Sequence, residues 1–151
     1  PERAHLRGKT GPTGRDYDSD LRGLGGTRAM PVATAPEDNL LHLPSDRKPQ
    51  ANVLVHEFAH SVMNLGLDDR LLKEVEEAYE EAMKGGLWKD AYASRNAGEY
   101  FAELTQCYFD AQQRNALDIR TRTALRDYDP TMYDLLARIF KDRELPDAEA
   151  R

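Results

Sequence analysis

Apolar residues recur every three or four positions through most of the chain from about residue 50 onward, which is the spacing of amphipathic helices. The pattern predicts four helices, over residues 51–65, 69–84, 96–114 and from Pro130 onward. Gly66 and the pair Gly85–Gly86 stand where the first two helices should end. Asp129 before Pro130 is typical of an N-cap followed by proline at the first helical position.

The first 50 residues lack this period. The Gly23–Gly26 segment has neither the preceding apolar strand nor the lysine of a phosphate-binding loop, so a flexible turn is expected there. Short extended segments are expected at residues 29–33 and 39–43, because nearby prolines exclude longer elements. Together the two patterns predict an α+β fold, in which a small N-terminal β-sheet packs on the helix at 51–65 and a mainly helical half follows.

The length of 151 residues indicates one domain, expected over residues 1–145 with an irregular segment at 1–30 and a disordered tail at 146–151. The net charge of −6 and the absence of a basic run argue against nucleic acid as a partner. No apolar run approaches the roughly 18–20 residues of a membrane span.

The single cysteine, Cys107, excludes an intramolecular disulfide and is expected in the core. Compartment and oligomeric state are left open.

The segment His56-Glu57-Phe58-Ala59-His60 fits H-E-x-x-H inside the most apolar predicted helix. Residues four apart lie on one face of a helix, so His56 and His60 can direct two imidazole nitrogens at one zinc ion. Glu57 lies about 100° round the helix, beside the ion, which suits a general base for a zinc-activated water. Two histidines that merely pack in a core are the alternative, and they would need other polar partners.

A catalytic zinc site needs a third protein ligand. Met63 and Gly66 stand where the extended metzincin motif has glycine and histidine, so that class is excluded. Glu99 is the best candidate, because it begins an otherwise apolar helix. Asn96 and Glu99 also fit a capping box, in which Glu99 would reach back to the helix start. Local sequence leaves both readings open, and the incomplete zinc pair upstream favours the ligand.

Three further residues are weaker candidates. Glu103 lies one helical turn after Glu99 and could accept the second N–H of a zinc-bound histidine, or it could be an ordinary surface glutamate. His5 and His42 are expected to face solvent, with His42 as a reserve ligand.

The stretch Glu99-Tyr-Phe-Ala-Glu103 follows H-E-x-x-H in the chain, and Tyr92 stands seven residues before Glu99. Over roughly residues 50–110 the chain resembles the zincin metallopeptidases of the anthrax lethal factor-like and Pro-Pro endopeptidase group. The resemblance implies a zincin-like fold, Glu99 as third zinc ligand, Tyr92 as a hydrogen-bond donor to the transition state, and a slight preference for secretion. Tyr92 could instead simply pack in the turn at residues 88–92.

These observations predict a zinc-dependent endopeptidase that acts on proteins or peptides, with the substrate extended beside an edge strand at residues 39–43. Two alternatives remain. One is a non-peptidase metalloenzyme, since two histidines and one carboxylate also bind Fe(II) in oxygenases. The other is a non-catalytic binding module on a zincin scaffold.

Overall fold

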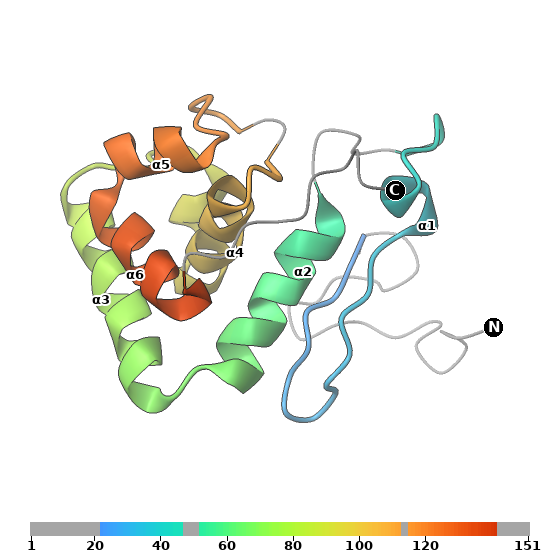
Figure 1. The fold of residues 1–151 in the computed structure, drawn as a ribbon, viewed down its shortest axis with the longest axis horizontal. Coiled ribbons are helices and arrows are strands. Elements are labelled where there is room, and N and C mark those ends of the chain that lie inside the picture. Colours follow the sequence, from blue (N-terminus) through green and yellow to red (C-terminus); the bar gives the residue numbers. More distant parts are fainter. Residues whose placement is uncertain (1–21, 47–51, 113–114, 142–151) are drawn as a thin grey trace.

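Helices make up nearly all of the regular structure in the computed structural model, which describes residues 22–46, 52–112 and 115–141 (Figure 1). In chain order they are α1 (Glu37–Leu40), α2 (Val53–Ser61), the π-helical turn η2 (Val62–Gly66), α3 (Asp69–Lys84), the 3₁₀ turn η3 (Tyr92–Ser94), α4 (Ala97–Tyr108), α5 (Arg122–Tyr128) and α6 (Pro130–Phe140). None of the helices in these ranges is long and apolar enough to cross a membrane.

Helix α4 forms the centre of the core. Its side chains from Tyr100 to Tyr108 are buried, apart from Glu103. A helix that is apolar on nearly all sides has to be enclosed by other elements, and α2, α3, α5 and α6 surround α4 (Figure 1). Cys107 is fully buried there, and burial raises the pKa of its thiol, so the prediction of a core cysteine is confirmed.

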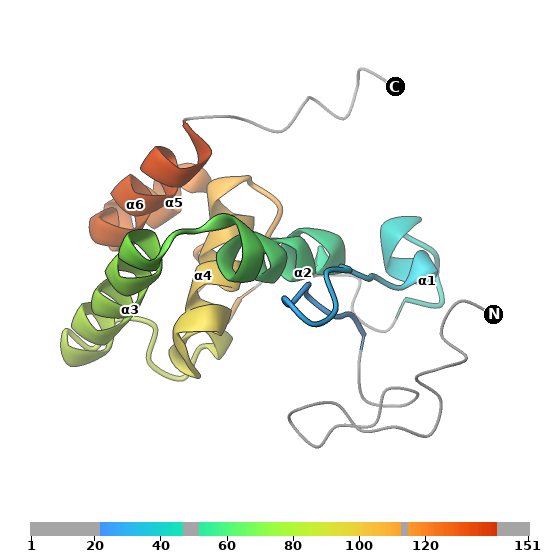
Figure 2. The same cartoon turned by 90° about the horizontal axis from the view of Figure 1, so that it is seen from below.

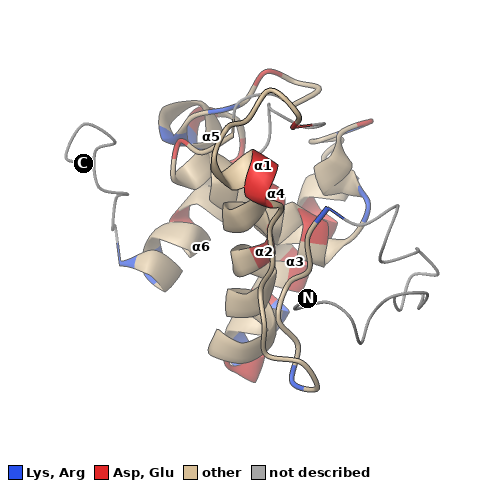
Figure 3. Ribbon diagram, turned by 90° about the vertical axis from the view of Figure 1, so that its right-hand side faces the viewer, with Lys and Arg blue, Asp and Glu red and all other residues tan. Residues whose placement is uncertain are grey.

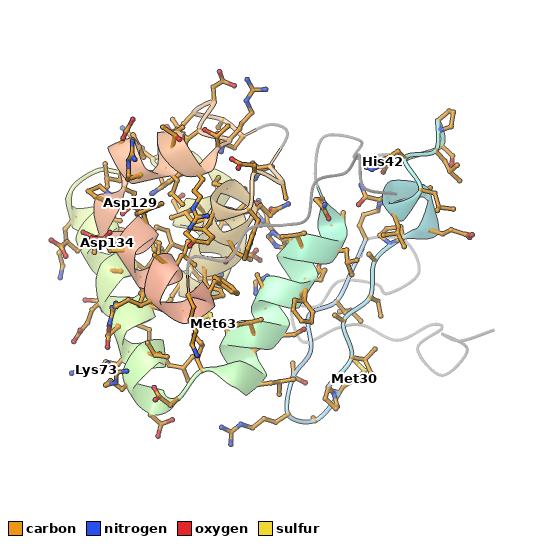
Figure 4. All side chains as sticks on the ribbon, viewed as in Figure 1. Met30, His42, Met63, Lys73, Asp129 and Asp134 are labelled. Atoms are coloured by element: carbon orange, nitrogen blue, oxygen red, sulfur yellow. The ribbon has the colours of Figure 1, made fainter. Side chains whose placement is uncertain are left out.

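Two predicted helices have boundaries where the sequence indicated. Helix α3 spans the predicted 69–84, and Gly86 follows it with a φ of 76°, the left-handed conformation that glycine adopts easily. Helix α6 begins at Pro130, and the Asp129 side chain accepts a hydrogen bond from the Met132 N–H. Asp129 also accepts hydrogen bonds from Trp88 and Tyr100 in the core, beside the start of α6 (Figure 4).

Helix α4 is shorter than predicted, since it ends at Tyr108 rather than near residue 114. The end is a Schellman motif, in which the Ala111 N–H bonds to the Gln106 carbonyl and the Asp110 N–H to the Cys107 carbonyl. Asp110 takes the left-handed position with a φ of 52°, and its carboxylate accepts a hydrogen bond from the Arg122 N–H. Without the usual glycine, the sequence carried no visible stop signal.

The predicted α+β fold with a small N-terminal β-sheet is wrong for the described part of the chain. Its N-terminal portion contains one isolated antiparallel bridge, between Leu24 and Thr34, and no sheet. Pro31 has no N–H to donate, and the backbone groups of Gly26 bond to side chains of α2 and η2 rather than to a further strand. The expected edge strand at residues 39–43 is also wrong, because this segment contains the end of α1 and a turn.

Residues 22–34 form a hairpin-like loop, here called the hairpin, that lies along α2. The Leu24–Thr34 bridge and a turn between Thr27 and Met30 hold its two arms together. Both views place α2 between the hairpin and α4 (Figures 1 and 2). The Gly26 N–H donates to Ser61 Oγ at 2.7 Å, and Asn64 Nδ2 donates to the Gly26 carbonyl at 3.0 Å. The hairpin is therefore anchored to the helix, and Gly23–Gly26 lie in one of its arms, before the turn between Thr27 and Met30.

A buried polar network joins the hairpin, α1 and the start of α2. Arg22 pairs with Asp38 and with Asp46, at 2.9 and 2.7 Å. Asp46 also accepts a hydrogen bond from Asn39, whose own side-chain oxygen accepts one from the Val53 N–H at 3.0 Å. Asp38 lies in the acidic first turn of α1 (Figure 3). The network ties the N-terminal segments to the first turn of the helix that carries the histidines.

Candidate metal centre

Helices α2 and α4 bring together the three residues expected to bind metal. His56 Nε2 lies 3.2 Å from His60 Nε2 and 3.1 Å from Glu99 Oε2, and the His60 and Glu99 atoms are 3.4 Å apart. The three side chains are about four-fifths buried. In the described ranges they form the one cluster of three or more His, Cys, Asp or Glu side chains close enough to share an ion.

Helix capping places both contributing segments. The Asn52 side chain caps α2 by accepting from the Val55 N–H, so His56 and His60 follow in the next two turns on one face. The Asn96 side chain caps α4 by accepting from the Glu99 N–H at 2.9 Å. The Glu99 carboxylate does not complete a capping box, because it points across to the two histidine rings. The Glu99 carboxylate thus contacts the histidines and not the helix start, and its role as a metal ligand stays a prediction.

The spacing of the three atoms fits a tetrahedral zinc ion. Bonds of about 2.0–2.1 Å from such an ion place its ligand atoms about 3.3–3.4 Å apart. The observed separations are 3.1, 3.2 and 3.4 Å. Two imidazole nitrogens and one carboxylate oxygen are also ligand types that zinc accepts, and three protein ligands leave a fourth position open.

The second nitrogen of His56 faces α4. His56 Nδ1 lies 3.3 Å from Glu103 Oε1 and 3.2 Å from Gln106 Oε1. Glu103 is in turn held by Gln112, whose Nε2 donates to Oε2 at 2.9 Å. Glu103 therefore lies beside His56 and is not an ordinary surface glutamate, while its role in orienting a metal-bound histidine stays a prediction. Sequence reasoning missed Gln106, although its spacing of seven residues from Glu99 places both on one helix face.

Carboxylates dominate the electrostatics of the cluster. Burial lowers the pKa of His56, but hydrogen bonds to Glu103 and Glu99 and the charges of Glu103 and Glu57 outweigh it and raise that pKa to about 10. Burial raises the pKa of Glu99, but its hydrogen bonds to His56 and His60 outweigh this and bring the pKa well below the usual range. The surroundings thus favour positive charge between the rings, which a divalent cation supplies.

Glu57 lies on the side of α2 that faces the hairpin. A Cβ atom added to Gly23 would stand 2.6 Å from Glu57 Cγ and 2.8 Å from Glu57 Oε1. Only a residue without a side chain fits so close, so Gly23 leaves the space that the Glu57 carboxyl group uses. Glu57 directly follows His56 on α2, and its negative charge is one of the causes that raise the pKa of His56.

Tyr92 lies at the rim of the cluster, on η3. Its hydroxyl donates to Glu99 Oε1 at 3.2 Å, so this carboxylate uses one oxygen for the histidines and the other for the phenol. The Tyr92 ring centroid is 6.1 Å from that of His56. The Arg95 guanidinium lies 4.2 Å from the same ring centroid, and Tyr92 remains more than a third exposed. Tyr92 therefore makes a hydrogen bond to Glu99 and does not only pack in the turn at residues 88–92, which was the alternative.

The remaining histidines do not join the cluster. His42 lies exposed beside α1 with a φ of 52°, and Figure 4 shows it away from the middle of α2. His5 and the tail at residues 146–151 lie outside the described residues, as does the irregular segment as far as residue 21.

Comparison of the chain with protein-family models, with curated proteins and with solved structures found no match. The candidate function therefore rests on the geometry of the cluster and on the residues around it.

Proposed function

We propose that this protein is a zinc-dependent endopeptidase that hydrolyses peptide bonds in proteins or peptides. The observation that carries the proposal is the near-tetrahedral spacing of His56 Nε2, His60 Nε2 and Glu99 Oε2, with Glu57 on the next position of the same helix. A general base next to an open metal position is the arrangement that hydrolysis by an activated water requires.

His56, His60 and Glu99 would hold the zinc ion. When bound, zinc lowers the pKa of a water molecule from near 16 towards about 7 and polarises a carbonyl group. The chain supplies the remaining chemistry. Glu57 accepts the proton of the attacking water and then delivers it to the leaving amine, as a positioned carboxylate does in general acid–base catalysis.

Tyr92 would donate a hydrogen bond to the oxygen of the scissile carbonyl as negative charge develops there. A phenol has a reference pKa of about 10, so it is protonated at neutral pH. In the present arrangement the Tyr92 hydroxyl donates its single proton in a hydrogen bond to Glu99 Oε1. The substrate oxygen therefore has to replace Glu99 as the acceptor, and the exposed position of Tyr92 on a one-turn helix leaves room for that change.

The test is cleavage of a diverse peptide library by the purified chain, with chelator and with added zinc. Cleavage should stop with the chelator and return with zinc. Glu57→Gln should keep zinc, because Glu57 is not a ligand, and should lower kcat by about 10²–10⁴-fold. Glu77→Gln is the matched control, since Glu77 lies exposed on α3 beside Lys73, and its kcat should equal that of the wild type.

Three results would contradict the proposal. Full turnover by Glu57→Gln would remove the general base. Zinc binding without cleavage of any peptide would favour the non-catalytic binding module. Iron in protein purified without added metal would favour the oxygenase-like alternative.

A further inference from the structure

The amide group of Gln106 has only one orientation that satisfies both of its contacts. Its Nε2 donates to the Asn52 carbonyl at 3.0 Å, and its Oε1 lies 3.2 Å from His56 Nδ1. A backbone carbonyl can only accept, so the amide nitrogen has to face Asn52 and the amide oxygen has to face His56. Gln106 is 1% exposed, which leaves no solvent to replace either contact.

This orientation determines which nitrogen of His56 keeps its proton when the other nitrogen binds a metal ion. The Gln106 oxygen can only accept, so His56 Nδ1 has to donate, and Glu103 Oε1 on the same nitrogen imposes the same role. A neutral imidazole with its proton on Nδ1 has its lone pair on Nε2. Nε2 is the atom that faces His60 and Glu99.

We propose that Gln106 is a positioning residue that locks the His56 ring, so that Nε2 is directed at the metal-ligand cluster in the tautomer able to bind a metal ion. Through its second contact, Gln106 is also hydrogen-bonded to Asn52, the residue that caps α2 one turn before His56. The ring is thus fixed relative to the start of its own helix by a side chain of α4. This inference rests on one part of the proposed function, the binding of zinc, and does not depend on peptide hydrolysis.

Gln106 and Glu103 have different tasks at the same nitrogen. Glu103 brings a negative charge to within 3.3 Å of Nδ1. Gln106 is neutral and adds no charge, while its donor end is already fixed by Asn52. A second carboxylate at this position would face the Asn52 carbonyl and repel it. An amide is therefore the side chain that can accept from His56 and donate to Asn52 at once.

The test is the zinc affinity of three variants, measured by competition with a chromogenic chelator and needing no substrate. Gln106→Met keeps the approximate volume and removes both hydrogen bonds, so its Kd for zinc should rise about 10–100-fold, as for other outer partners of a ligating histidine. Gln106→Glu keeps an acceptor for Nδ1–H, so its Kd should rise less than that of Gln106→Met. Thr105→Val is the control, because the buried Thr105 hydroxyl has no hydrogen-bond partner and its loss should leave Kd unchanged.

A second readout is the ¹⁵N NMR spectrum of the zinc-loaded wild type, which requires no variant to fold. The expected spectrum has a protonated, slowly exchanging Nδ1 on His56 and zinc on Nε2. Zinc on Nδ1 would overturn the inference, and so would a Gln106→Met variant with the zinc Kd of the wild type, or equal losses in Gln106→Met and Gln106→Glu. If the wild type binds no zinc, the proposed function fails instead, which separates the two outcomes.

Discussion

The two sides of α2 hold the helix by different means. On one side, His56 and His60 meet long polar side chains of α4, with contacts of 3.1–3.4 Å through Glu99, Glu103 and Gln106. On the other side the hairpin approaches with bare glycine backbone, because Gly23 and Gly25 leave no room for a Cβ. The α4 side supplies functional groups. The hairpin supplies none itself, and its glycines pack on the side of the helix that carries Glu57.

The difference teaches that a glycine-rich segment beside a reactive helix can be a packing surface. A Cβ at Gly25 would stand 2.3 Å from His60 Cβ and 3.0 Å from the Glu57 carbonyl oxygen. Both are atoms of the helix close to its axis, which cannot swing aside as the end of a long side chain can. The position of His60 is thus restricted from the hairpin side as well as from α4.

The largest expected effect is on the α4 side. Glu99→Ala removes the third candidate ligand, so the Kd for zinc should rise by more than the 10–100-fold that is typical for loss of an outer partner. Titration against a chromogenic chelator measures this change. His42→Ala is the control, because His42 lies apart from the cluster and its loss should not alter Kd. A Glu99→Ala variant that binds zinc as tightly as the wild type would show that the α4 side does not supply a ligand.

The next effect belongs to the hairpin side. Gly25→Ala forces a methyl group against α2, and overpacking of this kind costs about 1–3 kcal/mol in the free energy of unfolding. Urea unfolding in the presence of chelator measures the cost without a contribution from metal. Gly66→Ala is the matched control, since a Cβ there has its nearest neighbour, Val62 Cγ1, at an ordinary 3.9 Å. Equal stability of the two variants would mean that the hairpin does not pack tightly on α2.

The helical half was largely predictable because its determinants are local. Helix α3 matched its prediction at both ends, since a long apolar stripe and the pair Gly85–Gly86 lie within one stretch of sequence. Helix α5 was missed, because its seven residues contain one fully buried side chain, Leu125, and no stripe. The histidines and Glu57 could be found from their spacing alone, and Glu99 from the apolar helix around it.

The N-terminal part could not be predicted because its determinants are distant in sequence. Asn39 accepts a hydrogen bond from Val53, fourteen residues away, and Gly26 bonds to Ser61 across thirty-five. Prolines and glycines indicated short extended pieces, but only the folded contacts show that these pack on a helix instead of forming a sheet. Gln106 could not be predicted for a related reason. A glutamine on a buried helix belongs to no sequence motif, and its partners His56 and Asn52 are distant in sequence.

The smallest expected effect concerns the hydrogen bond between the hairpin and α2. Ser61→Ala removes the acceptor of the buried Gly26 N–H, and an unsatisfied buried donor costs about 1–3 kcal/mol. Alanine is the better helix former by roughly 0.5 kcal/mol, which offsets part of this cost and leaves a net loss near 1 kcal/mol. Amide hydrogen exchange at Gly26 is the most direct measurement, because local opening of the hairpin exposes this N–H before the whole chain unfolds. Ser61→Thr retains a hydroxyl and should protect the amide as the wild type does. Equally slow exchange at Gly26 in Ser61→Ala would mean that glycine packing alone keeps the hairpin closed on α2, and the two sides of the helix would then differ even more than the contacts indicate.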